Sequence, residues 1–551
     1  MKERDKLKTN TFIQGAFIAT FGIVISKILG IIYVIPFYAI IGEQGGALYG
    51  YAYSLYTIFL AISTVGLPLA VSKIVSEYNT LGYYNCKERA YKIAIKIISI
   101  MSVISFLILF IFSPLLASAI MGDITGGNTK EDITLVLRVA SLAIIFVANL
   151  SIFRGYLQGH KFITPSSVSQ VVEQLARVLL IIFGSFIALK IFKFPLSIAV
   201  SVAVFGATFG AIVASWYLRH KIKVNREQLN QKQSKTKEEE KITDKQILKK
   251  LLMYAFPLVV ISIITSSYEI VDTMTVVKTL VNEANFTTVD AESVISVLST
   301  WGSKFNMIVT SISSGIIVSL IPNITSSNVK NDQKDVANKI NQTVQIILLV
   351  ALPMTVGLSF LSQPVWGIFY GYDSIGPTVI RLSIFTAFTS CLSTSMIMIA
   401  QSLDEYKLVF VSLMSGILLK IILNSPLIIL FYHIGIYPYY GSIVATMIGS
   451  LTVTIINLVW LNRTRKINYL STLKQFGKVL ISLTGMVLIM YLVSYVIPLD
   501  IENRFASVLV VIAYTLIGFI VYAFLAHRTN VIKETFGENI YHKIPIIRKY
   551  V

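Results

Sequence analysis

Four cations interrupt long apolar stretches of this chain, and they are the side chains most clearly suited to a chemical role. Lys27 lies in the middle of the apolar stretch 11–41, and comparable stretches hold Arg177, Lys304 and Lys420. A lysine at the centre of a membrane-spanning helix costs roughly 2.5–3.5 kcal/mol on insertion scales, so it normally faces a charged partner or a water-filled cavity. A cavity lined by unpaired cations would suit an anionic substrate such as a phosphate.

Some of these cations also have a structural explanation. Glu173 lies four residues before Arg177, so the two side chains can form an ion pair on one helix face, and a structural pair is the favoured interpretation there. Lys304 could extend its ammonium to the membrane surface. Lys27, close to the middle of its span, is harder to explain in this way.

Few other side chains offer chemistry. Glu269 and Asp272 share one apolar stretch and could reach one of the lysines from a neighbouring helix. The five histidines are scattered, with no metal-ligand spacing and no nucleophile motif nearby: His160, His220, His433, His527 and His542. The sequence therefore predicts no enzyme, no metal site and no cofactor.

The composition is that of an integral membrane protein. Of 551 residues, 55% are hydrophobic and 14% are charged, whereas soluble domains carry about 25% charged residues. The net charge of +19 lies largely in short segments between apolar spans, which argues against a nucleic-acid partner. Cys86 and Cys391 are too far apart in the chain to form a disulfide framework.

Fourteen stretches of about 20 or more apolar residues are each long enough to cross a bilayer as a helix. They cover 12–41, 48–76, 93–117, 133–157, 163–189, 195–218, 251–281, 293–322, 340–366, 375–401, 407–431, 437–461, 475–497 and 504–526. Connections after even-numbered stretches are rich in Lys and Arg, and the others are mostly acidic or neutral. This alternation predicts that both termini are cytoplasmic. The first stretch is too long for a signal-peptide core and is expected to be retained.

A weak internal repeat divides the chain. Residues 158–177 align with 401–420, with glutamine on glutamine and cation on cation. The predicted organisation is an N-terminal lobe of six helices (1–220), a cytoplasmic linker (221–250), a C-terminal lobe of six helices (251–462), two further helices (463–527) and a cytoplasmic tail (528–551). An even number of helices in each half gives both repeats one orientation, with a substrate path between them.

The linker 221–250 is the one long polar segment. Its composition favours a solvated, partly helical or disordered tether. A contact with anionic lipid or with a partner is the alternative that its many cations leave open.

Three segments carry a family resemblance: EQGGALYGYAYSLYTIFLAISTVGLPLAVSK at 43–73, IFRGYLQGHKFITPSSVSQVVEQLARV at 152–178 and YEIVDTMTV at 268–276. They resemble the Gram-positive branch of MurJ-type lipid II flippases, in the multidrug/oligosaccharidyl-lipid/polysaccharide superfamily. The resemblance spans nearly the whole chain. It implies fourteen helices, two six-helix lobes, a groove at 463–527 for a polyprenyl tail, and a cationic central cavity for a diphosphate-sugar head.

Individual residues can be matched to the family pattern. ISKILG places Lys27 where the family has an essential arginine, and WGSKF makes Lys304 the cation of the eighth helix. The better-known Gram-negative pattern has an arginine–aspartate pair where this chain has Tyr33 or Val34, and no acidic residue follows Lys304. Lys73 is the candidate for the missing charge, and Arg177 with Glu173 completes the predicted substrate site.

The resemblance also implies a coupling site. Some relatives bind sodium between an acidic residue of the seventh helix and polar residues four apart on the eleventh, and the matching residues here are Asp272, Lys420 and Asn424. An ammonium can occupy the place of the ion. The sequence therefore predicts a Lys420–Asp272 pair and transport driven by the membrane potential without sodium.

The predicted function is the transfer of an undecaprenyl-diphosphate-linked peptidoglycan precursor, lipid II, from the inner to the outer leaflet of a bacterial plasma membrane. The expected partners are lipid II, membrane lipids and the cell-wall synthesis machinery. Three alternatives remain: an exporter of another polyprenyl-diphosphate oligosaccharide, a multidrug/cation antiporter, which would favour acidic cavity residues, and a non-transporting scaffold, which would not need buried lysines.

Overall fold

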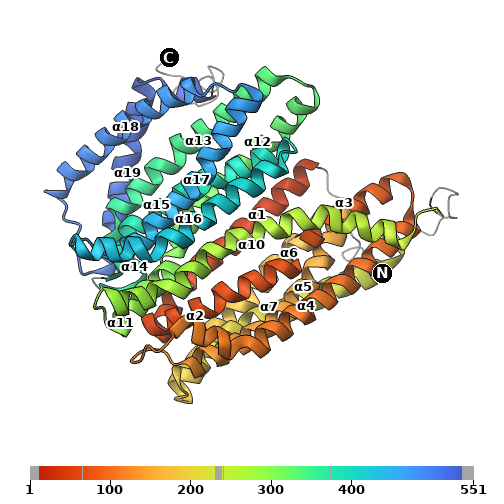
Figure 1. Ribbon diagram of the computed structural model, residues 1–551, viewed down its shortest axis with the longest axis horizontal. Helices are drawn as coiled ribbons and strands as arrows, with labels where there is room; N and C mark the ends of the chain where they lie inside the picture. Colours follow the sequence, from red (N-terminus) through yellow and green to blue (C-terminus); the bar gives the residue numbers. More distant parts are fainter. Residues whose placement is uncertain (1–11, 65, 230–238, 240, 373–374, 537–551) are drawn as a thin grey trace. The chain divides into compact units, whose positions relative to one another are not determined.

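The computed structural model describes residues 12–64, 66–229, 239, 241–372 and 375–536 (Figure 1). Regular secondary structure within these ranges is helical throughout, which confirms the predicted all-α class. The extreme N-terminus, the middle of the linker and the end of the tail, with its IPIIRKY segment, lie outside the described residues.

Twelve helical stretches within the described residues are long and apolar enough to span a membrane, so the chain is a multi-pass membrane protein. Each of them coincides with one of the fourteen predicted spans. The other two predicted spans, 12–41 and 293–322, hold α1 (Phe12–Ile32) and α12 (Ser303–Val329), which are not among the twelve.

The chain forms two compact units, Met1–Thr300 (unit 1) and Trp301–Val551 (unit 2). Unit 1 contains α1, α2 (Val34–Thr64), α3 (Gly66–Leu81), α4 (Tyr84–Met121), α5 (Lys130–Gly159), α6 (Ile163–Leu179), α7 (Leu196–Val224), α8 (Arg226–Leu229), α10 (Asp244–Glu283) and α11 (Thr288–Ser296). The boundary lies about fifty residues beyond the predicted start of the second lobe, because α10 packs against α2, α3 and α4.

Small residues allow the helices of unit 1 to approach closely. A Cβ atom on Gly155 of α5 would lie 2.4 Å from the carbonyl oxygen of Pro68 on α3, and one on Gly210 of α7 would lie 2.6 Å from that of Glu173 on α6. Lipid does not drive helices together as water does, so close packing between small residues is a main source of helix association. These contacts fix α5 and α6 against their neighbours.

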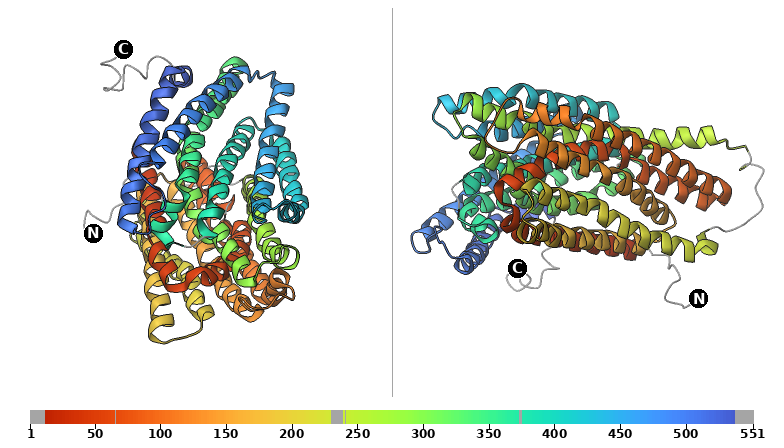
Figure 2. Two further views of the ribbon diagram at one scale, coloured as in Figure 1. Left: turned by 90° about the vertical axis from the view of Figure 1, so that its left-hand side faces the viewer. Right: turned by 90° about the horizontal axis from the view of Figure 1, so that it is seen from below.

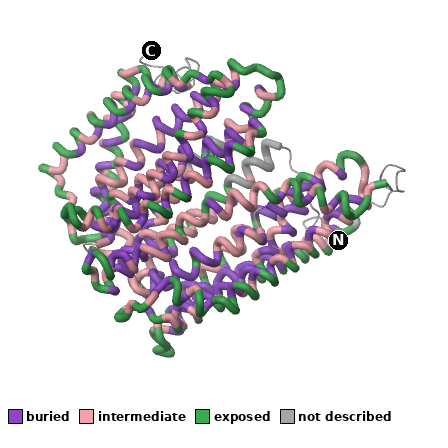
Figure 3. Tube along the Cα trace, viewed as in Figure 1, coloured by how far each residue is buried: buried purple, intermediate pink, exposed green. Residues whose placement is uncertain are grey.

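Unit 2 contains α12, α13 (Gln333–Phe360), α14 (Ser362–Tyr370), α15 (Ile375–Ser402), α16 (Tyr406–His433), α17 (Tyr440–Arg465), α18 (Leu470–Ser494), α19 (Arg504–Arg528) and α20 (Val531–Phe536). The helices α16 and α17 form an extensive antiparallel contact, in which Gly441 lies directly against the backbone of Leu427 and Ile428. The last two long helices, α18 and α19, lie side by side (Figures 1 and 2). Both carry many exposed positions (Figure 3), and a large share of the exposed residues are apolar.

The described parts of the linker are packed against unit 1. Glu239 is 3% exposed, and its carboxylate accepts the backbone N–H of Cys86 at 2.7 Å. Arg89 forms an ion pair at 2.5 Å with Asp244, the first residue of α10. The second half of the linker is therefore held by the first turns of α4, which the polar composition did not predict.

Candidate functional site

A cluster of three charged side chains lies on α5 and α6 of unit 1. Glu173 accepts Nη2 of Arg154 at 2.8 Å and Nη2 of Arg177 at 3.4 Å, so the expected pair of Glu173 and Arg177 is present. Arg154 also donates from Nε to Ser169 at 2.8 Å. The three charged side chains are 13–20% exposed, and they leave one net positive charge in a largely buried place.

Arg154 is the member that sequence reasoning missed. It lies within α5. Its partner Glu173 is nineteen residues away on the next helix, and no local spacing rule covers such a pair. Three tyrosines of α2, Tyr49, Tyr53 and Tyr56, lie within electrostatic range of Arg177 and give the cluster an aromatic surrounding.

Lys27 and Lys73 lie on other helices of unit 1. α1, which carries Lys27, packs against α6, where Gly22 meets Ser167. Lys27 is partly exposed. The Nζ of Lys73 on α3 lies 4.0 Å from the ring centroid of Tyr254 on α10, a distance typical of a cation–π contact. The predicted substrate role of these two cations stays a prediction.

Lys420 in unit 2 is fully buried, with all three donors of its ammonium directed at oxygen atoms. Nζ lies 2.9 Å from Oδ1 of Asn424, 2.9 Å from the carbonyl oxygen of Ser442 and 2.6 Å from Oγ1 of Thr446. A buried ammonium is tolerated only where such partners replace its water. Ser442 and Thr446 were not predicted, and their only signal is their spacing of four residues on the adjoining helix.

These contacts bear on the predicted coupling site. The fold brings the ammonium of Lys420 to the amide oxygen of Asn424. This contact is needed if the ammonium takes the place of a sodium ion. Asp272 lies on α10 in unit 1, so its pairing with Lys420 remains a prediction.

Lys304 is the second residue of α12, which begins directly after Gly302, and its side chain is partly exposed. The preceding residue of the turn, Trp301, is fully buried, and its carbonyl oxygen accepts the hydroxyl of Tyr370 at 3.1 Å. Two residues further on, Asn306 donates to Thr386 of α15 at 3.3 Å. The start of α12 is thus anchored on both sides of Lys304. Because Lys27 and Lys304 belong to different units, a shared cavity remains a prediction.

A buried carboxylate that the sequence did not single out lies outside the candidate spans. Glu292 of α11 is 0% exposed, and both of its oxygens lie 3.1 Å from the backbone nitrogen of Asn128. Burial raises the pKa of Glu292 to about 7, although the hydrogen bonds from Asn128 lower it. This carboxylate fastens the connection between α4 and α5 to α11.

His160 and the two cysteines are further buried titratable side chains. Burial lowers the pKa of His160, in the turn after α5, to about 4, so this imidazole is neutral at physiological pH. Both cysteines are buried, and neither forms a disulfide. Within the part of the chain that the structure describes, no three His, Cys, Asp or Glu side chains are grouped to hold a metal ion.

Comparison with solved structures shows which known proteins share this fold. A structure of "Lipid II flippase MurJ, inward closed conformation" matches with a TM-score of 0.61 and 18% identity, over 93% of this chain and 99% of that one. An inward-facing multidrug resistance MATE transporter of the MOP superfamily matches with a TM-score of 0.62 and 14% identity, over 81% and 98% of the two chains. At such identities the likeness concerns the fold alone.

Sequence comparison gives the family. The family model described as "Polysaccharide biosynthesis protein" matches residues 12–289. The chain is 31% identical to "Lipid II flippase MurJ" of Bacillus subtilis, over 97% of this chain and 98% of that protein. It is 28% identical to "Stage V sporulation protein B" of the same organism, over 31% of this chain. These matches confirm the resemblance seen in the motifs: the chain belongs to the MurJ family of lipid II flippases.

Proposed function

We propose that this protein flips lipid II, an undecaprenyl-diphosphate-linked peptidoglycan precursor, from the cytoplasmic to the outer leaflet by alternating access. The observation that carries the proposal is the 31% identity to a lipid II flippase over nearly the full length of both chains. The cations within apolar helices support it, because an anionic diphosphate needs positive partners when it leaves water.

The proposed architecture has fourteen spans. α1 and α12 join the twelve long apolar stretches, and α18 with α19 forms the surface for the polyprenyl tail. Exposed apolar side chains along both helices suit an isoprenoid chain, including Leu488 and Leu492 of α18 and Leu516 and Phe519 of α19. The other twelve spans make two pseudo-symmetric lobes of six.

The proposed headgroup site uses Lys27, Lys73, Lys304 and Arg177. Glu173 acts as a positioning residue, since it holds the guanidinium of Arg177 through the pair at 3.4 Å. The excess positive charge of the Arg154–Glu173–Arg177 cluster supports this assignment: one carboxylate shared by two guanidinium groups leaves attraction for a further anion.

The proposed energy source is the membrane potential. Lys420 with Asn424, and Asp272 from α10, would take the place of a sodium site. The three oxygens around the buried ammonium support this idea, because oxygens of this kind would otherwise be available to a cation. A potential that is negative inside favours outward movement of an anionic headgroup and inward return of an empty cationic cavity, at about 2.3 kcal/mol per elementary charge per 100 mV.

The proposed orientation has both termini in the cytoplasm, in the plasma membrane of the cell and close to the cell-wall synthesis machinery. It rests on the alternation of Lys- and Arg-rich connections with acidic or neutral ones.

Depletion tests the substrate. When the protein is removed from cells that have no other flippase, lipid II should accumulate on the cytoplasmic face and external precursor should fall. Accumulation of a different polyprenyl-diphosphate oligosaccharide would favour the rival exporter. Unchanged lipid pools together with sensitivity to organic cations would favour an antiporter and contradict the proposal.

A further inference from the structure

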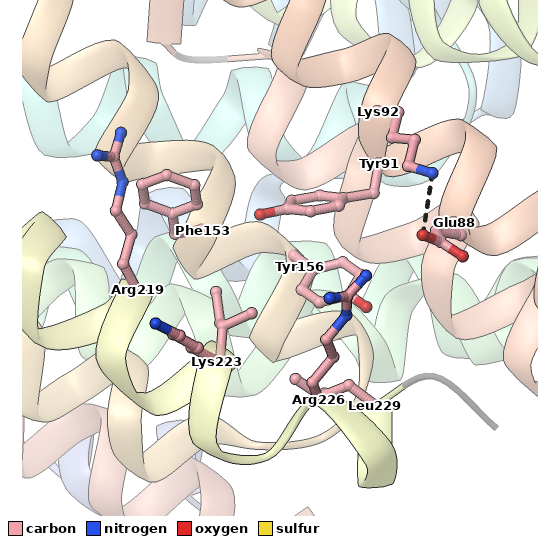
Figure 4. A pocket seen from close by; sticks show the side chains of 10 residues that line it. Glu88, Tyr91, Lys92, Phe153, Tyr156, Arg219, Lys223, Arg226 and Leu229 are labelled. Carbon is pink, nitrogen blue, oxygen red and sulfur yellow. Dashed lines mark ion pairs between the residues drawn. The ribbon is translucent and has the colours of Figure 1, made fainter.

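A pocket of about 320 Å³ opens in unit 1 where α4, α5 and α7 meet the short linker helix α8 (Figure 4). Four cations from three of these helices line it: Lys92, Arg219, Lys223 and Arg226. One carboxylate, that of Glu88, also lines it, and Lys92 neutralises this group at 3.0 Å. The pocket therefore carries an excess of about three positive charges.

The cations of α7 and α8 are available to an external anion. Arg219, Lys223 and Arg226 are exposed, and none of the three forms an ion pair with another described residue. The pocket adjoins the C-terminal end of α7, where the helix dipole repels anions. Side-chain charge, and not the helix end, must therefore supply the attraction.

Aromatic side chains give the pocket a rigid wall. Tyr91 stacks on Tyr156 with ring centroids 4.0 Å apart, and the guanidinium of Arg219 lies 5.2 Å from the ring centroid of Phe153. Phe153 and Tyr156 are buried, so this wall is part of the core of unit 1. Figure 4 shows Phe153 and Tyr91 between Arg219 on one side and the Lys92–Glu88 pair on the other.

An exposed tryptophan indicates that the pocket lies near the depth of lipid headgroups. Trp216, one turn before Arg219 on α7, is 73% exposed and stacks on His220. Tryptophan favours the interface of a bilayer, where its ring is apolar and its N–H meets water. The residues that follow on α7 therefore emerge from the hydrocarbon among the phosphates.

A second basic pocket lies in unit 2. It measures about 640 Å³ and lies between the start of α13, the end of α17 and the start of α18, with Lys334, Arg465, Lys466 and Lys474 in its lining. In the predicted repeat, α13 corresponds to α4 and α17 to α7. Each unit thus carries a cationic pocket beside one pair of helices that the predicted repeat matches, although the third long helix differs, α5 in unit 1 and α18 in unit 2.

We propose that the unit 1 pocket is a binding site for the headgroup of an anionic phospholipid such as phosphatidylglycerol. The phosphodiester would be held by the three cations that form no described ion pair: Arg219 and Lys223 of α7 and Arg226 of α8. Lys87 already ties the linker to this region, since its Nζ donates to the carbonyl oxygen of Leu229 and to Oδ1 of Asn79, both at 3.0 Å. A bound lipid would be a second contact that holds the linker against unit 1. This role does not depend on which substrate the protein transports.

A local reporter can test the site. Ile222 lines the pocket without carrying a charge, and both native cysteines are buried. In delipidated Ile222→Cys protein, dihexanoyl-phosphatidylglycerol should slow labelling by a neutral maleimide, and dihexanoyl-phosphatidylcholine should not. Adding Lys223→Ala with Arg226→Ala should raise the half-protecting concentration about thirtyfold, roughly fivefold for each cation near a charged surface.

Matched variants separate charge from folding. Lys245→Ala with Lys249→Ala removes two exposed cations at the start of α10, outside the pocket, and should leave protection unchanged. Lys223→Arg with Arg226→Lys keeps both charges and should restore protection. Equal protection by inorganic phosphate at the same concentration would identify a free-anion site, and equal protection by phosphatidylcholine would show no selection for charge. Either result, or no effect of the alanine pair, would overturn the proposal.

Discussion

The ammonium of Lys420 lies 2.9 Å from the amide oxygen of Asn424, one turn along α16, and both side chains are fully buried. Oxygens of Ser442 and Thr446 also surround the ammonium. We predict that the ammonium takes the place that a bound sodium ion would otherwise fill. We therefore expect flipping in vesicles to fall when the potential is collapsed and to be unchanged when sodium is replaced by choline. Arrest of the wild-type protein by sodium removal at constant potential would contradict this expectation.

Removing the ammonium of Lys420 should leave the oxygens of Asn424, Ser442 and Thr446 available to a sodium ion. Lys420→Ala leaves Asn424 and Thr446 without their charged donor, so the variant should lose activity or acquire a sodium requirement. Transport measured against sodium concentration distinguishes these results from an unaltered protein. Lys407→Ala, which removes an exposed lysine at the start of the same helix, is the control and should behave as wild type.

Lys27 and Lys304 should each be essential for flipping. Loss of either ammonium removes a charge-assisted hydrogen bond to the diphosphate, on the order of 1.5–3 kcal/mol. Lys27→Ala and Lys304→Ala should therefore abolish complementation at near-normal protein abundance, whereas Lys→Arg at either position should retain much of the activity. Growth supported by Lys27→Ala as the sole flippase would show that this lysine is not part of the headgroup site.

The orientation can be checked with single cysteines at exposed positions. Asp123→Cys, Glu283→Cys and Glu502→Cys should react with an impermeant thiol reagent in intact cells, because their connections are predicted to be external. Lys245→Cys and Arg463→Cys should react only after the membrane is opened. The buried native thiols keep the background low. Labelling of Lys245→Cys in intact cells would show that the topology is opposite to the predicted one.

Glu292 should make stability depend on pH. Its pKa is about 7 in the folded protein and about 4.5 when unfolded, so the folded state binds a proton more tightly. This contribution is fully present below about pH 4.5 and is lost as pH rises through 7. Glu292→Gln removes the buried charge and keeps an acceptor for Asn128. It should therefore raise the free energy of unfolding at pH 8 by about 3 kcal/mol at most, since one pKa unit corresponds to about 1.36 kcal/mol.

Thermal unfolding in detergent between pH 5 and pH 8 measures this effect. The melting temperatures of Glu292→Gln and wild type should converge at pH 5 and separate at pH 8, with the variant higher. Glu283→Gln, which neutralises an exposed carboxylate at the end of α10, controls for the change in net charge. Parallel pH profiles for Glu292→Gln and wild type would refute a raised pKa.

The sequence alone determined the all-α class, the apolar spans and the family. These properties follow from composition, length and motifs, which need no knowledge of contacts. It also determined the pair of Glu173 and Arg177, because residues four apart on a helix are neighbours whatever surrounds them.

Only the tertiary structure decided which distant residues complete each charged group. Arg154 reaches Glu173 across nineteen residues, Lys420 reaches Thr446 across twenty-six, and Asn128 reaches Glu292 across 164. Burial of Glu292 and docking of Glu239 have the same origin, since a polar residue in a connection looks solvated until packing covers it. Helical periodicity specifies which face a side chain occupies, but the partner of that face is selected by the packing of helices far apart in the chain.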